Sequence, residues 1–114
     1  RRLRLVTGIL ADKAVDEILS LLIPLATAGV IITTPHNPRA ADPHLVAEMA
    51  GRYAGEVPVE VVPDVDVAVR AAVAQTRPEE ALCICGSLYT VSEARETLKL
   101  LFPQADKDNR GGMQ

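Results

Sequence analysis

The sequence predicts an α/β fold in which helices cover both faces of a sheet of parallel strands. Four short runs of apolar and β-branched residues alternate along the chain with four longer runs in which apolar residues recur at the helical period. The apolar residues, 48% of the chain, are mostly aliphatic, and aromatic residues make up only 3%. This composition is typical of an aliphatic α/β core and not of an aromatic-rich β-sandwich.

The four candidate strands are almost uninterrupted apolar runs. They cover residues 3–7, 30–34, 59–62 and 82–85. A strand that is apolar at every position is buried on both faces, so we expect three layers, with the sheet between two layers of helices. Right-handed helical crossovers between mainly parallel strands then give an open, Rossmann-like sheet.

Each of the four helical runs has one apolar stripe. The stripes are Val15, Ile18, Leu19 and Leu22; Leu45, Met49 and Tyr53; Val65, Ala68, Val69 and Ala72; and Val91, Ala94, Leu98 and Leu101. Asp42 before Pro43 is a typical start for the second helix. Thr90 and Glu93 have the spacing of a capping box, so we expect the fourth helix to open there and to end at Pro103.

The length of 114 residues fits one domain with one core. We expect the domain to cover residues 1–106 and the polar residues 107–114 to form a frayed tail. The chain opens on Arg1 without a methionine, and its first apolar run begins at Leu3. We therefore interpret it as one domain of a longer polypeptide.

Charge and hydropathy exclude two classes of partner. The net charge is −3, and the only basic cluster is Arg1, Arg2 and Arg4, so nucleic acid is not expected to bind. No stretch approaches the ~18 apolar residues that span a bilayer, so we expect a soluble, cytoplasmic protein. Cys83 and Cys85 lie two apart on one face of a strand, a poor geometry for a disulfide, and are interpreted as buried thiols.

Polar residues follow directly after each candidate strand. Because ligands bind beyond the carboxyl ends of strands in open parallel sheets, we treat these turns as one surface. Their mixture of donors and acceptors matches a zwitterion with carboxylates and an amine. The residues are Asp12 and Lys13 after the first strand, His36, Asn37 and Arg39 after the second, Asp64 after the third, and Ser87 after the fourth.

Most of these residues also have a purely structural interpretation. Asp12 is expected to cap a helix beside a solvated Lys13, and Asp64 is expected to cap the third helix. The guanidinium of Arg39 either clamps a carboxylate through two parallel hydrogen bonds or pairs with a nearby surface acid. His36 is interpreted as a polar loop residue, because no second His, Cys or carboxylate lies at metal-ligand spacing from it.

The turn at Gly86 and Ser87 leads into a helix N-terminus, which favours an anion. An ordinary strand-to-helix turn explains Gly86 equally well. A stand-alone nucleotide- or anion-binding module is therefore an alternative, although no G-x-G-x-x-G fingerprint occurs. A signalling receiver domain is disfavoured, since the first strand ends in Thr7 and Gly8 and not in an acidic cluster.

Three short motifs occur in a fixed order after the first, second and fourth strands. They are Ala11-Asp12-Lys13, Asn37-Pro38-Arg39-Ala40 and Gly86-Ser87-Leu88-Tyr89. In this order and spacing, the chain from Leu3 to about Asp106 resembles the C-terminal domain of the folylpolyglutamate synthase and dihydrofolate synthase family of the Mur ligase superfamily. Gly-Ser-Leu-Tyr followed by Ser-Glu-Ala-Arg is the most specific part of the resemblance.

The resemblance implies a carboxylate-amine ligase that adds L-glutamate to a folate substrate through an acyl phosphate. It implies ATP and Mg²⁺ as cofactors, bound mainly by an N-terminal ATPase domain of the same polypeptide, and no cofactor or metal in this domain. It places no catalytic residue here. It assigns glutamate or folate binding to Arg39, Ser87, Asn37 and His36, and the interdomain cleft to Asp12, Lys13, Asp64 and Tyr89.

The chain departs from the family pattern in two places. Ala14 stands where the family usually has a second aspartate, and the family's first strand, which ends in Asp-Gly-Ala-His-Asn-Pro, and its helix do not occur. The phosphate-binding sequence G-x-x-x-x-G-K-[ST] does not occur either. We therefore expect the chain to be inactive alone and to self-associate through an exposed sheet edge or apolar face.

Overall fold

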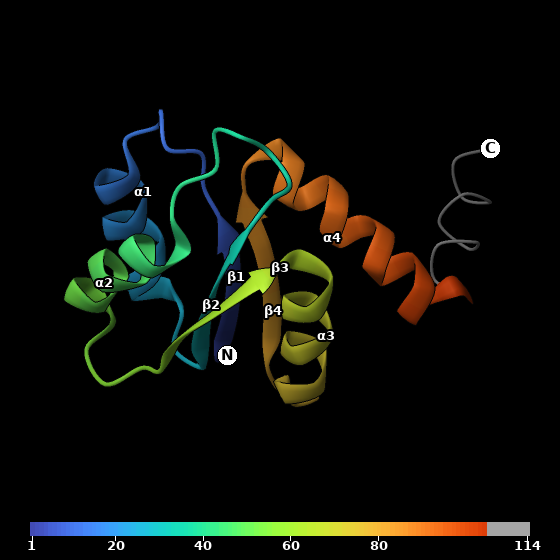
Figure 1. Ribbon diagram of the computed structural model, residues 1–114. Helices are drawn as coiled ribbons and strands as arrows, with labels where there is room; N and C mark the ends of the chain where they lie inside the picture. The colour runs from blue at the N-terminus through green and yellow to red at the C-terminus, as the bar shows by residue number, and fades with distance from the viewer. Residues whose placement is uncertain (105–114) are drawn as a thin grey trace.

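Helices cover both faces of a four-stranded parallel sheet in the computed structural model, which describes residues 1–104 (Figure 1). The strand order is β3-β2-β1-β4. The strands are β1 (Leu3–Gly8), β2 (Gly29–Thr34), β3 (Val59–Asp64) and β4 (Ala81–Gly86). The helices are α1 (Val15–Leu22), the short 3-10 helix η1 (Ile23–Leu25), α2 (Pro43–Ala54), α3 (Val65–Gln75) and α4 (Leu88–Leu101). The predicted three-layer α/β fold is confirmed.

The two central strands are buried on both faces, whereas the two edge strands are not. β1 pairs with both β2 and β4, and β3 pairs only with β2. Most residues of β3 and β4 remain partly exposed. The expectation of full burial is correct for β1 and β2 and wrong for β3 and β4, because a strand at the edge of a sheet has no neighbour on one side.

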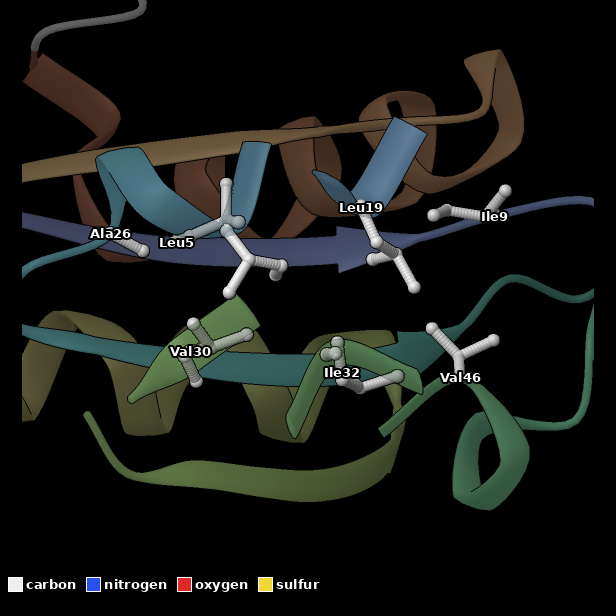
Figure 2. Close-up of a cluster of buried hydrophobic side chains, with 10 residues drawn as sticks. Leu5, Ile9, Leu19, Ala26, Val30, Ile32 and Val46 are labelled. Atoms are coloured by element: carbon white, nitrogen blue, oxygen red, sulfur yellow. The ribbon is translucent and has the colours of Figure 1, made fainter. Parts of the chain in front are cut away.

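Alternate residues of the central strands enter two separate cores. Leu5, Val30 and Ile32 face α1 and α2, where they pack with Leu19 and Val46 (Figure 2). The residues between them face the other way, against α3, in a cluster formed by Val6, Ile31, Ala68 and Ala72. This alternation is the period of two that an extended strand imposes on its side chains.

The apolar stripe predicted for α3 is buried at every position, and the stripe predicted for α2 is displaced. Val46, Ala50 and Ala54 form the buried face of α2, whereas Leu45 is 58% exposed. Asp42 caps α2 as expected, since its carboxylate accepts the backbone N–H of His44 at 2.9 Å. The displacement of the α2 stripe arises because alanines contribute little to an apolar pattern yet fill the close contact with the sheet.

The fourth helix begins earlier than predicted. Ser87, and not Thr90, is the N-cap, and its hydroxyl accepts the backbone N–H of Thr90 at 3.1 Å. Thr90 is fully buried and donates to the carbonyl of Gly8 at 2.9 Å. The capping-box prediction is wrong, and the carboxylate of Glu93 contacts His36 instead of capping the helix. The end of the helix is predicted correctly, as α4 stops at Leu101, just before Pro103.

Cys83 and Cys85 lie on the face of β4 toward α1 and α2, and both are free thiols. They are partly exposed and not fully buried, because β4 is an edge strand. Burial raises the pKa of the Cys85 thiol, and the neighbouring Cys83 adds to the effect. The Cys85 thiol therefore does not have the low pKa of a reactive cysteine.

No helix within residues 1–104 is long and apolar enough to cross a membrane. The tail predicted for residues 107–114 lies outside the described residues, as do the last two residues of the predicted domain.

Candidate functional site

The loops after β1 and β2 are joined at the carboxyl edge of the sheet. The backbone N–H of Ala11 donates to the carbonyl of Arg39 at 2.7 Å, and that of Ala41 donates to the carbonyl of Ile9 at 2.9 Å. Leu10 and Ala40 form an isolated antiparallel bridge between the same two loops. The Asp-Lys and Asn-Pro-Arg motifs are therefore brought side by side, as the parallel topology predicted.

Arg39 pairs with Asp12 across these joined loops. Its Nη1 lies 3.1 Å from Oδ2 of Asp12, and the two side chains are 57% and 48% exposed. The prediction that Asp12 caps a helix is wrong, because Ala14 is the N-cap residue of α1 and no side chain bonds there. The backbone N–H of Arg39 donates to Oδ1 of Asn37 at 2.8 Å, which shapes the turn that presents the guanidinium.

A mostly apolar pocket of about 620 Å³ lies between α1 and the β4–α4 turn. Lys13 and Ser87 are its main polar lining residues, and Tyr89 lies at its exposed wall. The complete lining is Ile9, Leu10, Lys13, Ile18, Leu21, Leu22, Cys85, Gly86, Ser87, Leu88 and Tyr89. The sequence patterns identified Lys13, Ser87 and Tyr89 but missed the aliphatic walls from α1, which have the spacing of a core stripe.

Ser87 and Gly86 have structural roles in addition to lining the pocket. Ser87 caps α4, and its backbone N–H donates to the carbonyl of Gly8 at 2.9 Å. Gly86 has a φ of 119°, and a Cβ at this position would lie 2.3 Å from the carbonyl oxygen of Gly8. The turn therefore requires glycine, which accounts for Gly86 without a ligand.

His36 and Glu93 connect the β2–α2 loop to α4. The backbone N–H of His36 donates to Oε2 of Glu93 at 2.8 Å, and its ring Nδ1 contacts Oε1 of the same carboxylate. The imidazole is 77% exposed. The interpretation of His36 as a polar loop residue is consistent with this geometry. Glu93 was missed as a partner of this loop, because its spacing from Thr90 assigned it to a capping box.

Asp64 makes no side-chain hydrogen bond or ion pair with the other candidate residues in the described part of the chain. Its carboxylate accepts the backbone N–H of Val67 at 3.0 Å and caps α3, as the sequence predicted. It stands at the carboxyl end of the edge strand β3, where it is paired in register with Thr34. Asp64 therefore shares the carboxyl edge of the sheet with Arg39 and Ser87, but none of its hydrogen bonds reaches the pocket.

Within residues 1–104, no three His, Cys, Asp or Glu side chains gather in a group that would hold a metal ion. The carboxylates at this edge have other partners: Asp12 pairs with Arg39, Glu93 contacts His36, and Asp64 caps α3. The donor set of the described residues therefore does not fit a divalent cation.

Comparison with solved structures shows that this fold is similar to part of several folylpolyglutamate synthases. A folylpolyglutamate synthase of Mycobacterium tuberculosis, complexed with ADP and AMPPCP, is 31% identical and has a TM-score of 0.62 over 85% of this chain and 23% of its own. The enzyme of Thermotoga maritima is 32% identical, with a TM-score of 0.66 over 86% of this chain and 21% of its own. A bifunctional folylpolyglutamate synthase/dihydrofolate synthase of Yersinia pestis, complexed with AMPPNP and Mn, is 26% identical, with a TM-score of 0.73 over 85% of this chain and 22% of its own.

The chain spans less than a quarter of the length of these enzymes. No curated protein sequence matches it. The family model of the Mur ligase glutamate ligase domain matches residues 1–88, which include β1 to β4, the Asp-Lys and Asn-Pro-Arg motifs, and the Gly-Ser-Leu-Tyr motif up to Leu88. The chain therefore belongs to the Mur ligase family, as a glutamate ligase domain.

Proposed function

We propose that this chain is the amino-acid-binding domain of a ligase that adds L-glutamate to dihydropteroate, to tetrahydrofolate, or to both. The observation that carries the proposal is the convergence of two cations, Lys13 and Arg39, on joined loops beside the Ser87 pocket. L-Glutamate has two carboxylates and one ammonium group. Two cations and the carboxylate of Asp12 match that charge pattern.

Arg39 is the residue best suited to hold one carboxylate of glutamate. Of its guanidinium nitrogens, only Nη1 donates to a side chain among the described residues, that of Asp12. The other guanidinium N–H groups can form the paired hydrogen bonds that a carboxylate accepts. Lys13 makes no ion pair within residues 1–104 and lines the pocket, where it would attract the second carboxylate. Asn37 shapes the Arg39 turn, and His36 anchors its start.

Ser87 and Tyr89 would complete the binding surface on the α4 side. The Thr90 hydroxyl donates to Gly8, so the Ser87 hydroxyl donates to Thr90. Ser87 can then accept a further hydrogen bond from a ligand in the pocket. Tyr89 is 44% exposed beside it. Asp64, on the far edge strand, would meet the rest of the ligase across the interdomain cleft and not the glutamate itself.

In the proposed reaction, the amine of glutamate attacks the carbonyl carbon of an acyl phosphate, the C–N bond forms, and inorganic phosphate leaves. ATP supplies the phosphoryl group that activates the carboxylate. We assign ATP and Mg²⁺ to an N-terminal ATPase domain of the same polypeptide, since the described residues do not fit a metal and the chain has no G-x-x-x-x-G-K-[ST] sequence. This domain contributes binding, orientation and closure, and we expect no ATP hydrolysis by the 114-residue chain alone.

Titration of the isotope-labelled 114-residue chain with L-glutamate, followed by NMR, tests the proposal. We expect the amides of the Arg39 loop and of the β4–α4 turn to shift together. Arg39→Ala should weaken binding by roughly 1–3 kcal/mol, because charge-assisted hydrogen bonds to the carboxylate are lost. Arg39→Lys should weaken it almost as much, since lysine keeps the charge but loses the planar fork. In a longer ligase that contains this domain, both variants should raise the glutamate KM and leave the ATP KM unchanged.

Arg52→Ala is the matched control for these variants. Arg52 also forms a partly exposed pair with an aspartate, Asp16, at 3.6 Å, but between α1 and α2. Glutamate binding that is equally weak in the Arg39 and Arg52 variants would contradict the proposal. Shifts at Leu88 and Tyr89 produced by inorganic phosphate but not by glutamate would favour the alternative, a stand-alone anion-binding module.

A further inference from the structure

The carboxylate of Glu93 holds the loop that carries Arg39. Glu93 lies in the second turn of α4, and it contacts His36, 57 positions away in the sequence, at the start of the β2–α2 loop. One carboxylate oxygen accepts the backbone N–H of His36 at 2.8 Å and the other contacts ring Nδ1. Because the two oxygens bind a backbone group and a side-chain group of one residue, the contact fixes both the position and the orientation of His36.

The part of α4 that carries Glu93 is held firmly on the sheet. The first turn of α4 is attached to the end of β1, because the buried hydroxyl of Thr90 and the backbone N–H of Ser87 both donate to the carbonyl of Gly8 at 2.9 Å. The side chain of Glu93 is 27% exposed, whereas that of His36 is 77% exposed. Glu93 therefore links an exposed loop to a part of the helix that is fixed on the sheet.

The loop has attachments on both sides of Arg39. On the C-terminal side, the carbonyl of Arg39 accepts the N–H of Ala11, and Ala40 bridges to Leu10. On the N-terminal side, Glu93 supplies the hydrogen bonds between His36 and another element. The hydrogen bonds of Asn37 stay within the loop, to Pro35, Arg39 and Ala40. Loss of the Glu93 contact would remove the hydrogen bonds to α4, so that the N-terminal side of the loop is held only by the end of β2 at Thr34 and by the buried Pro35 among the described residues.

We propose that Glu93 is a positioning residue, which holds the β2–α2 loop so that the Arg39 guanidinium keeps a fixed place relative to Ser87. The ligand in this inference is glutamate, so it rests on the function proposed above. Glu93 itself touches no substrate. A hydrogen bond from a backbone N–H to an ionised carboxylate is among the stronger ones in proteins, so its loss should be measurable.

Amide hydrogen exchange in the 114-residue chain tests the positioning role directly. In Glu93→Ala, we expect the His36 amide to exchange at least about tenfold faster, while amides of the buried strand β1 keep their rates. Glu93→Gln should recover most of the protection, because its amide oxygen can still accept the bond. His36→Ala should have a smaller effect on the Arg39 turn, because it removes the ring contact and leaves the backbone bond. Glu96→Ala, which breaks an exposed pair with Lys99 on the same helix, is the control.

L-Glutamate titration of the same variants connects the loop to binding. We expect Glu93→Ala to raise the Kd by about three- to tenfold, Glu93→Gln to restore it, and Glu96→Ala to leave it unchanged. If Arg39→Ala abolishes glutamate binding and Glu93→Ala leaves it unaltered, the inference about Glu93 is wrong and the proposed function stands. Absence of binding in the wild type would overturn the proposed function, and the exchange rates would then decide whether Glu93 holds the loop. Unaltered His36 exchange in Glu93→Ala would refute the inference in either case.

Discussion

At the scale of single residues, one buried carboxylate holds the amino ends of the strands, opposite the candidate site. The side chain of Glu80 is 2% exposed. It accepts the backbone N–H of Arg77 at 3.0 Å and lies 3.4 Å from Nη2 of Arg4 and 3.6 Å from Nη1 of Arg2. The Arg77 N–H, with the Arg4 and Arg2 guanidinium groups, holds the pKa of Glu80 below its ordinary value.

The lowered pKa of Glu80 makes the stability of the domain depend on pH. The stabilisation that the ionised Glu80 carboxylate supplies is complete above the pKa of Glu80 in the unfolded chain, near 4.5. It is lost as the pH falls through the lower pKa of Glu80 in the folded domain. We expect Glu80→Gln to be less stable than the wild type at pH 7 and the difference to shrink below about pH 4.5. Urea unfolding at several pH values measures this difference. The exposed neighbour Glu79 offers a control, Glu79→Gln, whose unfolding should follow the wild type.

Gly86 gives a second prediction for a single residue. Gly86→Ala should destabilise the domain by about 2 kcal/mol or more, because alanine is strained at a positive φ and its Cβ would collide with the Gly8 carbonyl. Gly51, in the middle of α2, is exposed, and a Cβ added there would meet no atom within 4 Å, so Gly51→Ala should stabilise by roughly 0.5–1 kcal/mol. Thermal and chemical unfolding measure the change in stability of each variant relative to the wild type. Equal effects at the two positions would contradict the strain assigned to Gly86.

At the scale of elements, side-chain hydrogen bonds connect neighbouring helices on each face of the sheet. The buried Thr97 of α4 donates to Oδ1 of Asp66 on α3 at 2.7 Å, and Arg70 donates to Oδ2 at 3.0 Å. On the other face, Tyr53 of α2 donates to Asp16 of α1 at 2.8 Å. These bonds fix the relative positions of the neighbouring helices on each face.

The α3–α4 contact can be tested through the titration of Asp66. The Thr97 hydroxyl, and then Arg70, lower the pKa of the Asp66 carboxyl. In Thr97→Val, which keeps the shape of the side chain, we expect this pKa to rise toward its ordinary value, as read from the NMR titration of the carboxyl carbon. Thr76→Val is a suitable control, because the Thr76 hydroxyl bonds to the carbonyl of Ala72 within its own helix end. An unshifted Asp66 titration in Thr97→Val would show that this bond is not formed in solution.

At the scale of the whole molecule, the sheet has two open edges and an apolar surface beside one of them. Leu88 and Leu21 are 81% and 75% exposed, and both line the pocket next to β4. Open edges and exposed leucines favour association between chains. We therefore expect the self-association predicted from the sequence to occur through the surface that contains Leu21 and Leu88.

We expect the apparent mass of the 114-residue chain to rise with concentration in sedimentation or light scattering. Leu21→Ser combined with Leu88→Ser should shift the chain toward the monomer, because the exposed apolar contact is weakened. Leu45→Ser, at a leucine 58% exposed on α2, is the matched control and should leave association unaltered. A chain that stays monomeric at millimolar concentration would refute this expectation.

Local patterns in the sequence specify the order of the elements and most of their bounds. Continuous apolar runs mark strands, and the α3 stripe of Val65, Ala68, Val69 and Ala72 is buried as predicted. Asp42 and Asp64 cap their helices as predicted. These features can be predicted because a cap or a stripe depends on residues within one or two turns of each other.

The meeting of distant groups, in contrast, follows from the packing of the whole chain. Asp12 and Glu93 both have local interpretations as cap residues, yet they bind Arg39 and His36, from which they are separated by 27 and 57 positions. Nothing in the spacing of the strands indicates that β4 lies beside β1 at an open edge, which leaves Cys83 and Cys85 partly exposed and forms the pocket wall. Strand order and loop contacts depend on how all the elements pack together, so periodicity and spacing do not specify them.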